Sequence, residues 1–243
     1  MRGILWSIMA AASCVAATPA PAAEPRSDAK DVDDAAVLVA SEIATWDAWR
    51  HQCSVAMPSD ARAIASYYVK WLVETRTEIL AMRAYAQFDR KNPEEFEAME
   101  KKQDPHAVAS ASRTSGHTRE QVCLATFQKM KEGGMSFARK YPVAEKLLKN
   151  YSAAHALSRH ALRTYDNPMG CLKTALNQGV DYDAAKRVCD CNWKVMSASL
   201  TLPEWDEYEA AVGTRSRDQV QALPQIKRNL PKLAACAAEL ASH

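Results

Sequence analysis

Apolar side chains recur at every third or fourth position along most of the chain from residue 33 onward, which is the repeat of one face of an α-helix. The first segment with this repeat covers residues 33–57, and a longer one covers 60–90. The apolar positions are Val39, Ile43, Trp46, Trp49 and Cys53 in the first segment, and Ile64, Tyr67, Tyr68, Trp71, Leu72, Ile79, Met82 and Tyr85 in the second. Each segment is therefore predicted to be one amphipathic helix whose aromatic residues belong to the core.

Helix-capping residues predict where the next helices begin. Asn92 followed by Pro93 starts a third helix that ends near residue 102, because Asn caps a helix and Pro suits its first turn. Thr118 and Gln121 have the spacing of a capping box, which predicts the start of a fourth helix.

The same signals continue through the C-terminal part of the chain. Pro142 starts a fifth helix, which we expect to run to about residue 165 because Asn167 and Pro168 follow. The later helices are a short sixth that contains Cys171 and ends at Gly179, a seventh capped by Asp183, an eighth capped by Thr201 with Glu204, and a last over 217–240 that Pro224 and Pro231 bend or split.

Residues 103–117 differ from the rest because they contain no periodic apolar position. They predict an exposed flexible linker or loop. The linker separates an N-terminal helical half, 33–102, from a C-terminal half, 118–243. The fold class predicted is all-α, a helical bundle of about eight or nine helices that forms one domain or two closely packed halves.

The amino-acid composition supports this fold class, and the net charge argues against one class of partner. The chain of 243 residues has only 7 glycines and 4 phenylalanines, which favours helices over a sandwich of short strands. Its formal net charge of +2 gives no reason to expect a nucleic-acid partner.

Residues 1–23 have the order of segments found in a secretory signal peptide: a basic residue, an apolar run over 4–12, then small residues and prolines. Cleavage after Ala23 or the alanine before it leaves residues 24–32 as a disordered lead-in. Acylation of Cys14, as in a bacterial lipoprotein, is the alternative. The sequence thus predicts an exported protein, periplasmic in a bacterium, without a transmembrane segment after signal removal.

Six cysteines remain after the signal peptide, and an even number in an exported chain predicts three disulfides. Residues two apart on a helix point about 200° away from each other, so Cys189 and Cys191 are not expected to bond together. Two pairings of the four C-terminal cysteines then remain, and the position of Cys189 near the core face favours one of them. The expected bonds are Cys53 with Cys123, Cys171 with Cys189, and Cys191 with Cys236; zinc ligation is the alternative.

No catalytic or metal-binding motif is found in the sequence. His155 and His160 lie five positions apart, which places them on different sides of one helix. The chain contains no Gly-x-Ser-x-Gly, Glu-x-x-His or Cys-x-x-Cys sequence. We therefore predict no catalytic residue, no metal site and no cofactor.

Charge is distributed unevenly, with acidic residues prevailing over 28–47 and basic residues over 129–173. On the predicted fifth helix Lys149, Arg159 and Arg163 cluster opposite the apolar face. One interpretation is a docking surface for an acidic protein or an anionic envelope polymer. The other is an ordinary charged surface, partly complemented by the acidic first helix.

These observations predict an exported, non-catalytic binding protein of the bacterial cell envelope. It would act on a protein partner, either as an inhibitor or immunity-type protein or as an adaptor or chaperone. The alternative is an envelope enzyme whose site is assembled from separated helices and leaves no motif in the sequence.

Overall fold

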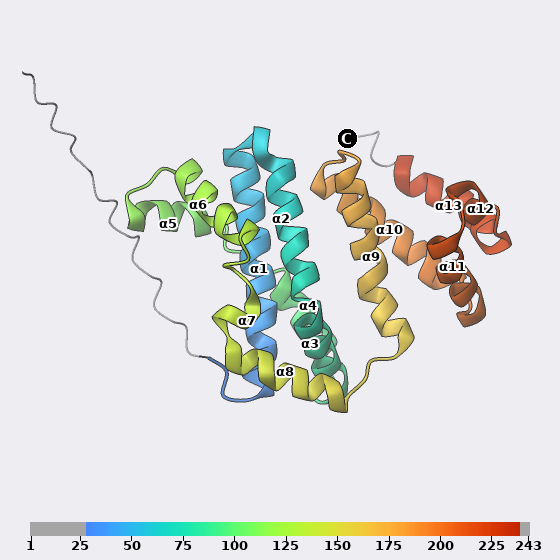
Figure 1. Cartoon of the computed structure of the whole chain (residues 1–243), viewed down its shortest axis with the longest axis horizontal. Coiled ribbons are helices and arrows are strands. Elements are labelled where there is room, and N and C mark those ends of the chain that lie inside the picture. The colour runs from blue at the N-terminus through green and yellow to red at the C-terminus, as the bar shows by residue number, and fades with distance from the viewer. Residues whose placement is uncertain (1–27, 239–243) are drawn as a thin grey trace, which may run out of the picture.

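The longest helix in the described range is α1 (Val32–Ala56), and helices formed by residues between 61 and 154 pack around it (Figure 1). The computed structural model describes residues 28–238, and over this range it contains helices and no strand. The predicted all-α, disulfide-bonded bundle is confirmed. The remaining elements are η1 (Pro58–Asp60), α2 (Ala61–Glu74), α3 (Arg76–Phe88), α4 (Pro93–Glu100), α5 (Ala107–Ser115), α6 (Arg119–Lys131), α7 (Phe137–Lys140), α8 (Pro142–Ala154), α9 (Arg159–Asn177), α10 (Tyr182–Ser199), α11 (Leu202–Thr214), α12 (Arg217–Gln221) and α13 (Pro224–Ala238).

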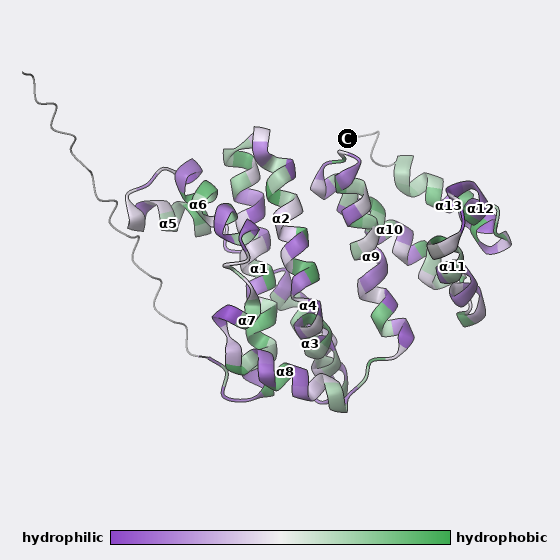
Figure 2. Ribbon diagram, viewed as in Figure 1, coloured by the Kyte–Doolittle hydropathy of each residue, from purple (hydrophilic) through white to green (hydrophobic). Residues whose placement is uncertain are grey.

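Helix α1 is buried on more sides than its apolar repeat predicted, because α2, α3, α4 and α8 all pack against it. Between its large residues it carries fully buried alanines such as Ala36 and Ala40, and small side chains let neighbouring backbones approach closely. Asp31 caps its first turn by accepting a hydrogen bond from the amide of Asp34 at 2.9 Å. Figure 2 shows that hydrophobic and hydrophilic residues alternate along the helices around α1, as amphipathic packing requires.

The prediction of one long helix over 60–90 was wrong at a single residue. Thr75 leaves the helical conformation with φ −91° and ψ 11°, and it separates α2 from α3. The division has a packing consequence, since α2 contacts α9 whereas α3 contacts α8.

The predicted flexible linker at 103–117 contains α5, so its assignment as an irregular segment was wrong over that helix. Val108 is buried, and its amide donates a hydrogen bond to Oε1 of Gln52 at 3.0 Å. The same Gln52 side chain donates to the carbonyl of Asp104 at 2.7 Å. A contact with α1 therefore orders a segment that has too few apolar residues to show a repeat.

The disordered lead-in predicted at 24–32 was also wrong over its described part, residues 28–32. The Asp28 carboxylate accepts hydrogen bonds from the amides of Val143 and Ala144 at 2.8 and 3.0 Å, which caps the start of α8. Ala29 is buried in the core. The predicted signal peptide at 1–23, the alternative at Cys14 and residues 24–27 lie outside the described residues.

The predicted fifth helix is two helices. The chain breaks after α8, and Ser158 then caps α9 by accepting from the amide of Ala161 at 3.2 Å. Pro168 lies inside α9 and does not end it, contrary to the prediction. Because proline has no N–H, the carbonyl of Thr164, four residues earlier, lacks its usual helical donor. The cap of α10 is Asp181, two residues before the predicted Asp183.

All three expected disulfides are present, with Cα–Cα distances of 5.6 Å for Cys53–Cys123 and 5.7 Å for the other two. On α10, Cys189 bonds to Cys171 of α9 and Cys191 bonds to Cys236 of α13. The two neighbouring cysteines thus reach different helices, as their opposite directions on one helix predicted. The capping boxes of Thr118 with Gln121 and Thr201 with Glu204 are also confirmed.

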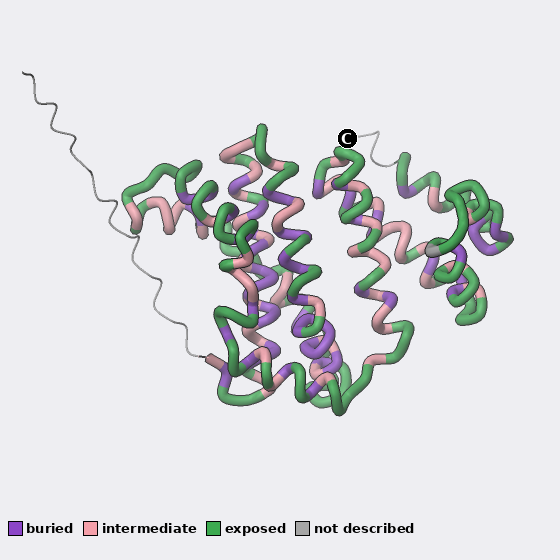
Figure 3. The backbone as a smooth tube through the Cα atoms, in the orientation of Figure 1, coloured by how far each residue is buried: buried purple, intermediate pink, exposed green. Residues whose placement is uncertain are grey.

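Within residues 28–238, the buried residues form two separate cores. The larger core contains residues between Ala29 and Cys189, so it includes parts of both predicted halves. The smaller core is formed by residues from the end of α10, from α11 and from the start of α13. The division in packing therefore falls within α10 and not at 103–117. Figure 3 shows buried residues concentrated in α1, α2 and α3, and mainly exposed ones in α12 and α13. None of the helices in the described range is long and apolar enough to span a bilayer.

Candidate binding cleft between two helical walls

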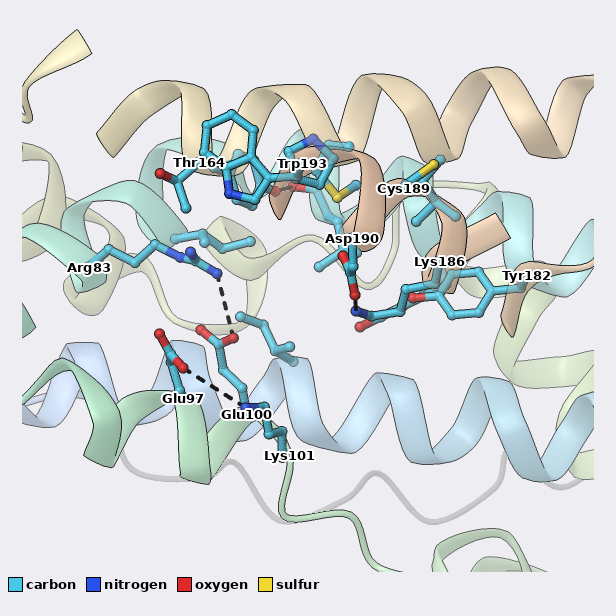
Figure 4. Close-up of a pocket in the computed structure, with 18 of the residues that line it drawn as sticks. Arg83, Glu97, Glu100, Lys101, Thr164, Tyr182, Lys186, Cys189, Asp190 and Trp193 are labelled. Atoms are coloured by element: carbon cyan, nitrogen blue, oxygen red, sulfur yellow. Dashed lines mark hydrogen bonds and ion pairs between the residues drawn. The ribbon is translucent and has the colours of Figure 1, made fainter. Parts of the chain in front are cut away.

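A cleft of about 450 Å³ lies between a wall formed by α3 and α4 and a wall formed by α9 and α10 (Figure 4). Its floor is apolar and comes from α1, α2 and the start of α3, with Ile43, Leu72 and Ile79 among the lining residues. The two walls come from segments far apart in the sequence. The cleft therefore has no local sequence motif.

Aromatic side chains line the cleft, and two of them, Tyr68 and Tyr182, are in contact with each other. Tyr68 stacks on Trp71 with ring centroids 6.4 Å apart, and it also meets the ring of Tyr182 at 5.9 Å. The guanidinium of Arg50 lies over the ring of Tyr182, 3.9 Å from its centroid. Burial raises the pKa of the Tyr182 hydroxyl well above its ordinary value, so it stays protonated at neutral pH.

The wall formed by α3 and α4 presents an ion pair between Arg83 and Glu100, 3.6 Å from Nη2 to Oε2. This separation exceeds a good hydrogen bond, and Nε of Arg83 is buried without a hydrogen-bond partner among the described residues. The guanidinium also lies 5.6 Å from the ring centroid of Tyr165. Burial raises the pKa of the Glu100 carboxyl, while Arg83 and Lys186 oppose that effect.

The opposite wall presents one face of α10 to the cleft. Tyr182, Lys186, Cys189, Asp190 and Trp193 occupy positions i, i+4, i+7, i+8 and i+11, which places them on the same side of the helix. Lys186 and Asp190 form an ion pair at 2.5 Å. Each wall therefore carries cations and carboxylates together, above an apolar floor.

A second cavity of about 300 Å³ adjoins the first and shares four of its lining residues. The shared residues are Arg83, Glu97, Glu100 and Thr164. Beyond them the second cavity is lined mainly by apolar side chains, including Met82, Phe96 and Leu157. The Arg83–Glu100 pair thus stands at the junction of two apolar cavities.

The predicted partner-binding residues do not share one exposed face, which corrects the prediction. Lys149 lies on α8 and pairs with Glu145, whereas Arg159 and Arg163 belong to α9. Arg163 is buried, with its side chain 5% exposed, and it pairs with Asp206 at 2.6 Å and with Glu209 at 2.7 Å. Its partners come from α11 and not from the acidic first helix.

The histidines on these helices have aromatic neighbours. His155 stacks on Tyr151 with ring centroids 4.2 Å apart, and His160 lines the second cavity near Trp193. Among the described residues, no group of three or more His, Cys, Asp or Glu side chains is placed to hold a metal ion. All six cysteines of that range are bonded in disulfides.

A buried charged cluster that the sequence did not reveal fixes α7 to α1. Glu42 is 1% exposed and accepts hydrogen bonds from Trp46 Nε1 and the Tyr141 hydroxyl, both at 2.9 Å. Lys140 contacts the same carboxylate at 2.6 Å. We interpret the cluster as structural, since its hydrogen bonds satisfy a carboxylate inside the core.

The sequence analysis did not identify the cleft because it assigned the aromatic residues to the core. The available signal was on α10, where Lys186 and Asp190 occupy the same helical face as Cys189. Comparison with protein-family models, curated proteins and solved structures gives no match. The geometry of the cleft is therefore the basis for assigning a function.

Proposed function

We propose that the protein is an exported, non-catalytic binding protein that holds a protein partner in the cleft between α3/α4 and α9/α10. The observation that carries this proposal is the cleft itself, with an apolar floor and charged residues of both signs on its rims. Such a concave site, with a few polar groups around an apolar surface, is typical of binding sites.

The disulfides support both export and binding. Three bonds in one chain are typical of an oxidising compartment, such as the bacterial periplasm. Cys171–Cys189 also joins α9 to α10, so one wall of the cleft is a cross-linked pair of helices. A wall that is ordered before binding reduces the entropy lost when the partner binds. An inhibitor or immunity-type protein and an adaptor or chaperone of the cell envelope both fit this description.

The alternative of an envelope enzyme is supported by one residue, Glu100. Its carboxyl lies in the cleft wall, and burial raises its pKa, as in many general acids. The variant Glu100→Gln separates the two functions. It keeps the shape and an acceptor oxygen of the side chain, so a binding protein retains its partner, whereas an enzyme that uses this proton loses turnover.

Site-directed photo-cross-linking in the producing cell tests the proposed function. Glu97 lines both cavities with a side chain that is 62% exposed, and Glu94 lies exposed on the same helix outside both cavities. A benzoylphenylalanine at residue 97 lies on the rim, where it can contact a bound partner without filling the junction. It should give a discrete protein adduct, and the same group at residue 94 should not. Equal labelling from both positions, or none from residue 97, contradicts binding in the cleft.

A further inference from the structure

We infer that the ligand of the cleft is a peptide segment with two apolar side chains, one for each cavity, and that Arg83 and Glu100 bind the peptide group between them. This inference rests on the proposed function and specifies the chemistry of the partner. It follows from the division of the cleft, the hydrogen-bonding groups at the division and the balance of charge.

The division of the cleft favours two separate side chains over one bulky group. The cavities of about 450 and 300 Å³ meet at the Arg83–Glu100 pair and have different apolar residues beyond it. Their sizes lie at the lower end of the range of about 300–1,000 Å³ for sites of small ligands. A peptide backbone that crosses the ion pair can place one side chain in each cavity.

The groups at the junction match the hydrogen-bonding capacity of a peptide group. The Arg83 side chain is 36% exposed, and its guanidinium end supplies N–H donors that a carbonyl oxygen can accept from, since the nearest Glu100 oxygen at 3.6 Å is too far for a good hydrogen bond. Glu100 supplies carboxylate oxygens that accept from a peptide N–H.

Charge also favours a neutral group over an ion at the junction. Arg83 is opposed by Glu100 at 3.6 Å, and on the other wall Lys186 is opposed by Asp190 at 2.5 Å. A ligand with a single charge gains attraction from one member of each pair and repulsion from the other. An amide has both a donor and an acceptor and no net charge, so it suits both members of the Arg83–Glu100 pair.

The inference is tested with fluorescein-labelled heptapeptides of Gly, Ser and Ala that carry two leucines, with zero to three residues between them. Fluorescence anisotropy should detect binding at a preferred spacing. Peptides with one leucine should bind roughly tenfold more weakly, which corresponds to the loss of one buried leucine side chain. Methylation of the amide nitrogens between the leucines should weaken binding roughly fivefold or more, because it removes the N–H groups.

Two pairs of variants locate the binding. Thr164→Trp fills the junction and should abolish peptide binding, whereas Thr174→Trp, at an exposed position of the same helix outside both cavities, should leave it unchanged. Arg83→Met should weaken binding roughly tenfold through the loss of a charged donor. Arg90→Met is its control, because Arg90 has a similar exposure, 40% against 36%, and pairs with Asp33 and Glu95 outside both cavities. Thermal melts of all four variants show whether each is folded.

Three results overturn the inference. They are equal binding of one-leucine and two-leucine peptides, full binding by folded Thr164→Trp, and competition by dodecanoate in place of any peptide. A protein adduct at residue 97 in the cell, together with any of these results, leaves the proposed function standing and removes the two-cavity peptide. The reverse result is no adduct in the cell together with clear binding of two-leucine peptides. It supports the peptide site and contradicts the proposed protein partner.

Discussion

The two cores of the molecule differ in how much apolar surface they bury, although each also contains a disulfide and a buried ion pair. The larger core surrounds α1 and contains many fully buried large side chains, among them Trp71, Ile79 and Met82. The smaller core, between the end of α10 and helices α11 and α13, has few buried side chains, and Trp205 is the largest of them. It is supplemented by a covalent bond from α10 to α13 and by the buried Arg163 with its carboxylates on α11.

This difference shows how a small helical unit remains folded when its apolar core is insufficient. A region that buries little apolar surface relies on cross-links and ion pairs, as small disulfide-rich domains do. The larger region gains most of its stability from apolar burial. The same comparison predicts that a destabilising substitution in the smaller core will unfold only that unit. An equivalent substitution in the larger core will destabilise the whole protein.

Replacing the main tryptophan of each core is the strongest test of this comparison. Trp71 and Trp205 are both buried, at 1% and 2% exposure. Each substitution by alanine should cost about 3–5 kcal/mol at its site, through lost burial and the cavity that remains. Trp71→Ala should lower the unfolding temperature of the whole protein. Trp205→Ala should unfold only α11 to α13, which hydrogen exchange detects as lost amide protection over 202–238.

Hydrogen exchange of the Trp205→Ala variant also has a clear opposing outcome. Protection lost equally over 32–189 means that the two cores unfold as one cooperative unit, and the comparison then fails.

Removal of Cys191–Cys236 tests the covalent contribution to the smaller unit. The bond closes a sequence separation of 45 residues, so its loss should cost about 4 kcal/mol in the chain-entropy model. The double variant Cys191→Ser with Cys236→Ser should release α13 from α10 while the larger core stays protected. Cys53→Ser with Cys123→Ser is the matched control in the larger core, where its effect should spread to the whole unfolding transition. Unchanged hydrogen exchange in α13 after removal of Cys191–Cys236 would show that packing alone holds that helix.

Much of the fold was predictable because its signals are local. The periodicity of α1, the capping boxes at Thr118 and Thr201, and the opposite directions of Cys189 and Cys191 each depend on residues within one helix. The directions of the two cysteines also excluded a bond between them and left two pairings, of which the position of Cys189 near the core face favoured the observed one.

The errors occurred where a distant residue decides the local structure. Gln52 orders α5, the start of α8 uses Asp28 as its cap, and Asp206 and Glu209 bury Arg163. No nearby residue indicates any of these contacts. The cleft was missed for the same reason, since its walls come from two pairs of helices separated by more than fifty residues of chain.

The smallest expected effect on the free energy of unfolding concerns a carboxylate buried in the larger core, one oxygen of which accepts no hydrogen bond from the described residues. Glu78 of α3 is 5% exposed, and its Oε2 has no hydrogen-bond partner among the described residues. Burial raises the pKa of its carboxyl, and the nearby Glu145 adds to the increase while Lys149 opposes it. The buried charge beside the smaller core, Arg163, pairs with two carboxylates, and of its guanidinium nitrogens only Nη1 lacks a hydrogen-bond partner among the described residues.

Glu78→Gln should therefore stabilise the larger core at neutral pH and widen the difference between the two units. Since the folded-state pKa of Glu78 is raised, its ionisation destabilises the fold as the pH rises from the ordinary value of 4.5 through the folded-state pKa. The gain should be about 1 kcal/mol at pH 7, the usual cost of an unsatisfied buried acceptor. It should vanish near pH 4, where the carboxyl is protonated in both states. Urea unfolding of the variant and the parent at both pH values measures it, and Glu94→Gln at the exposed start of α4 serves as the control. A gain that is equal at pH 4 and pH 7 would mean that Glu78 destabilises the core through its shape and not through its charge.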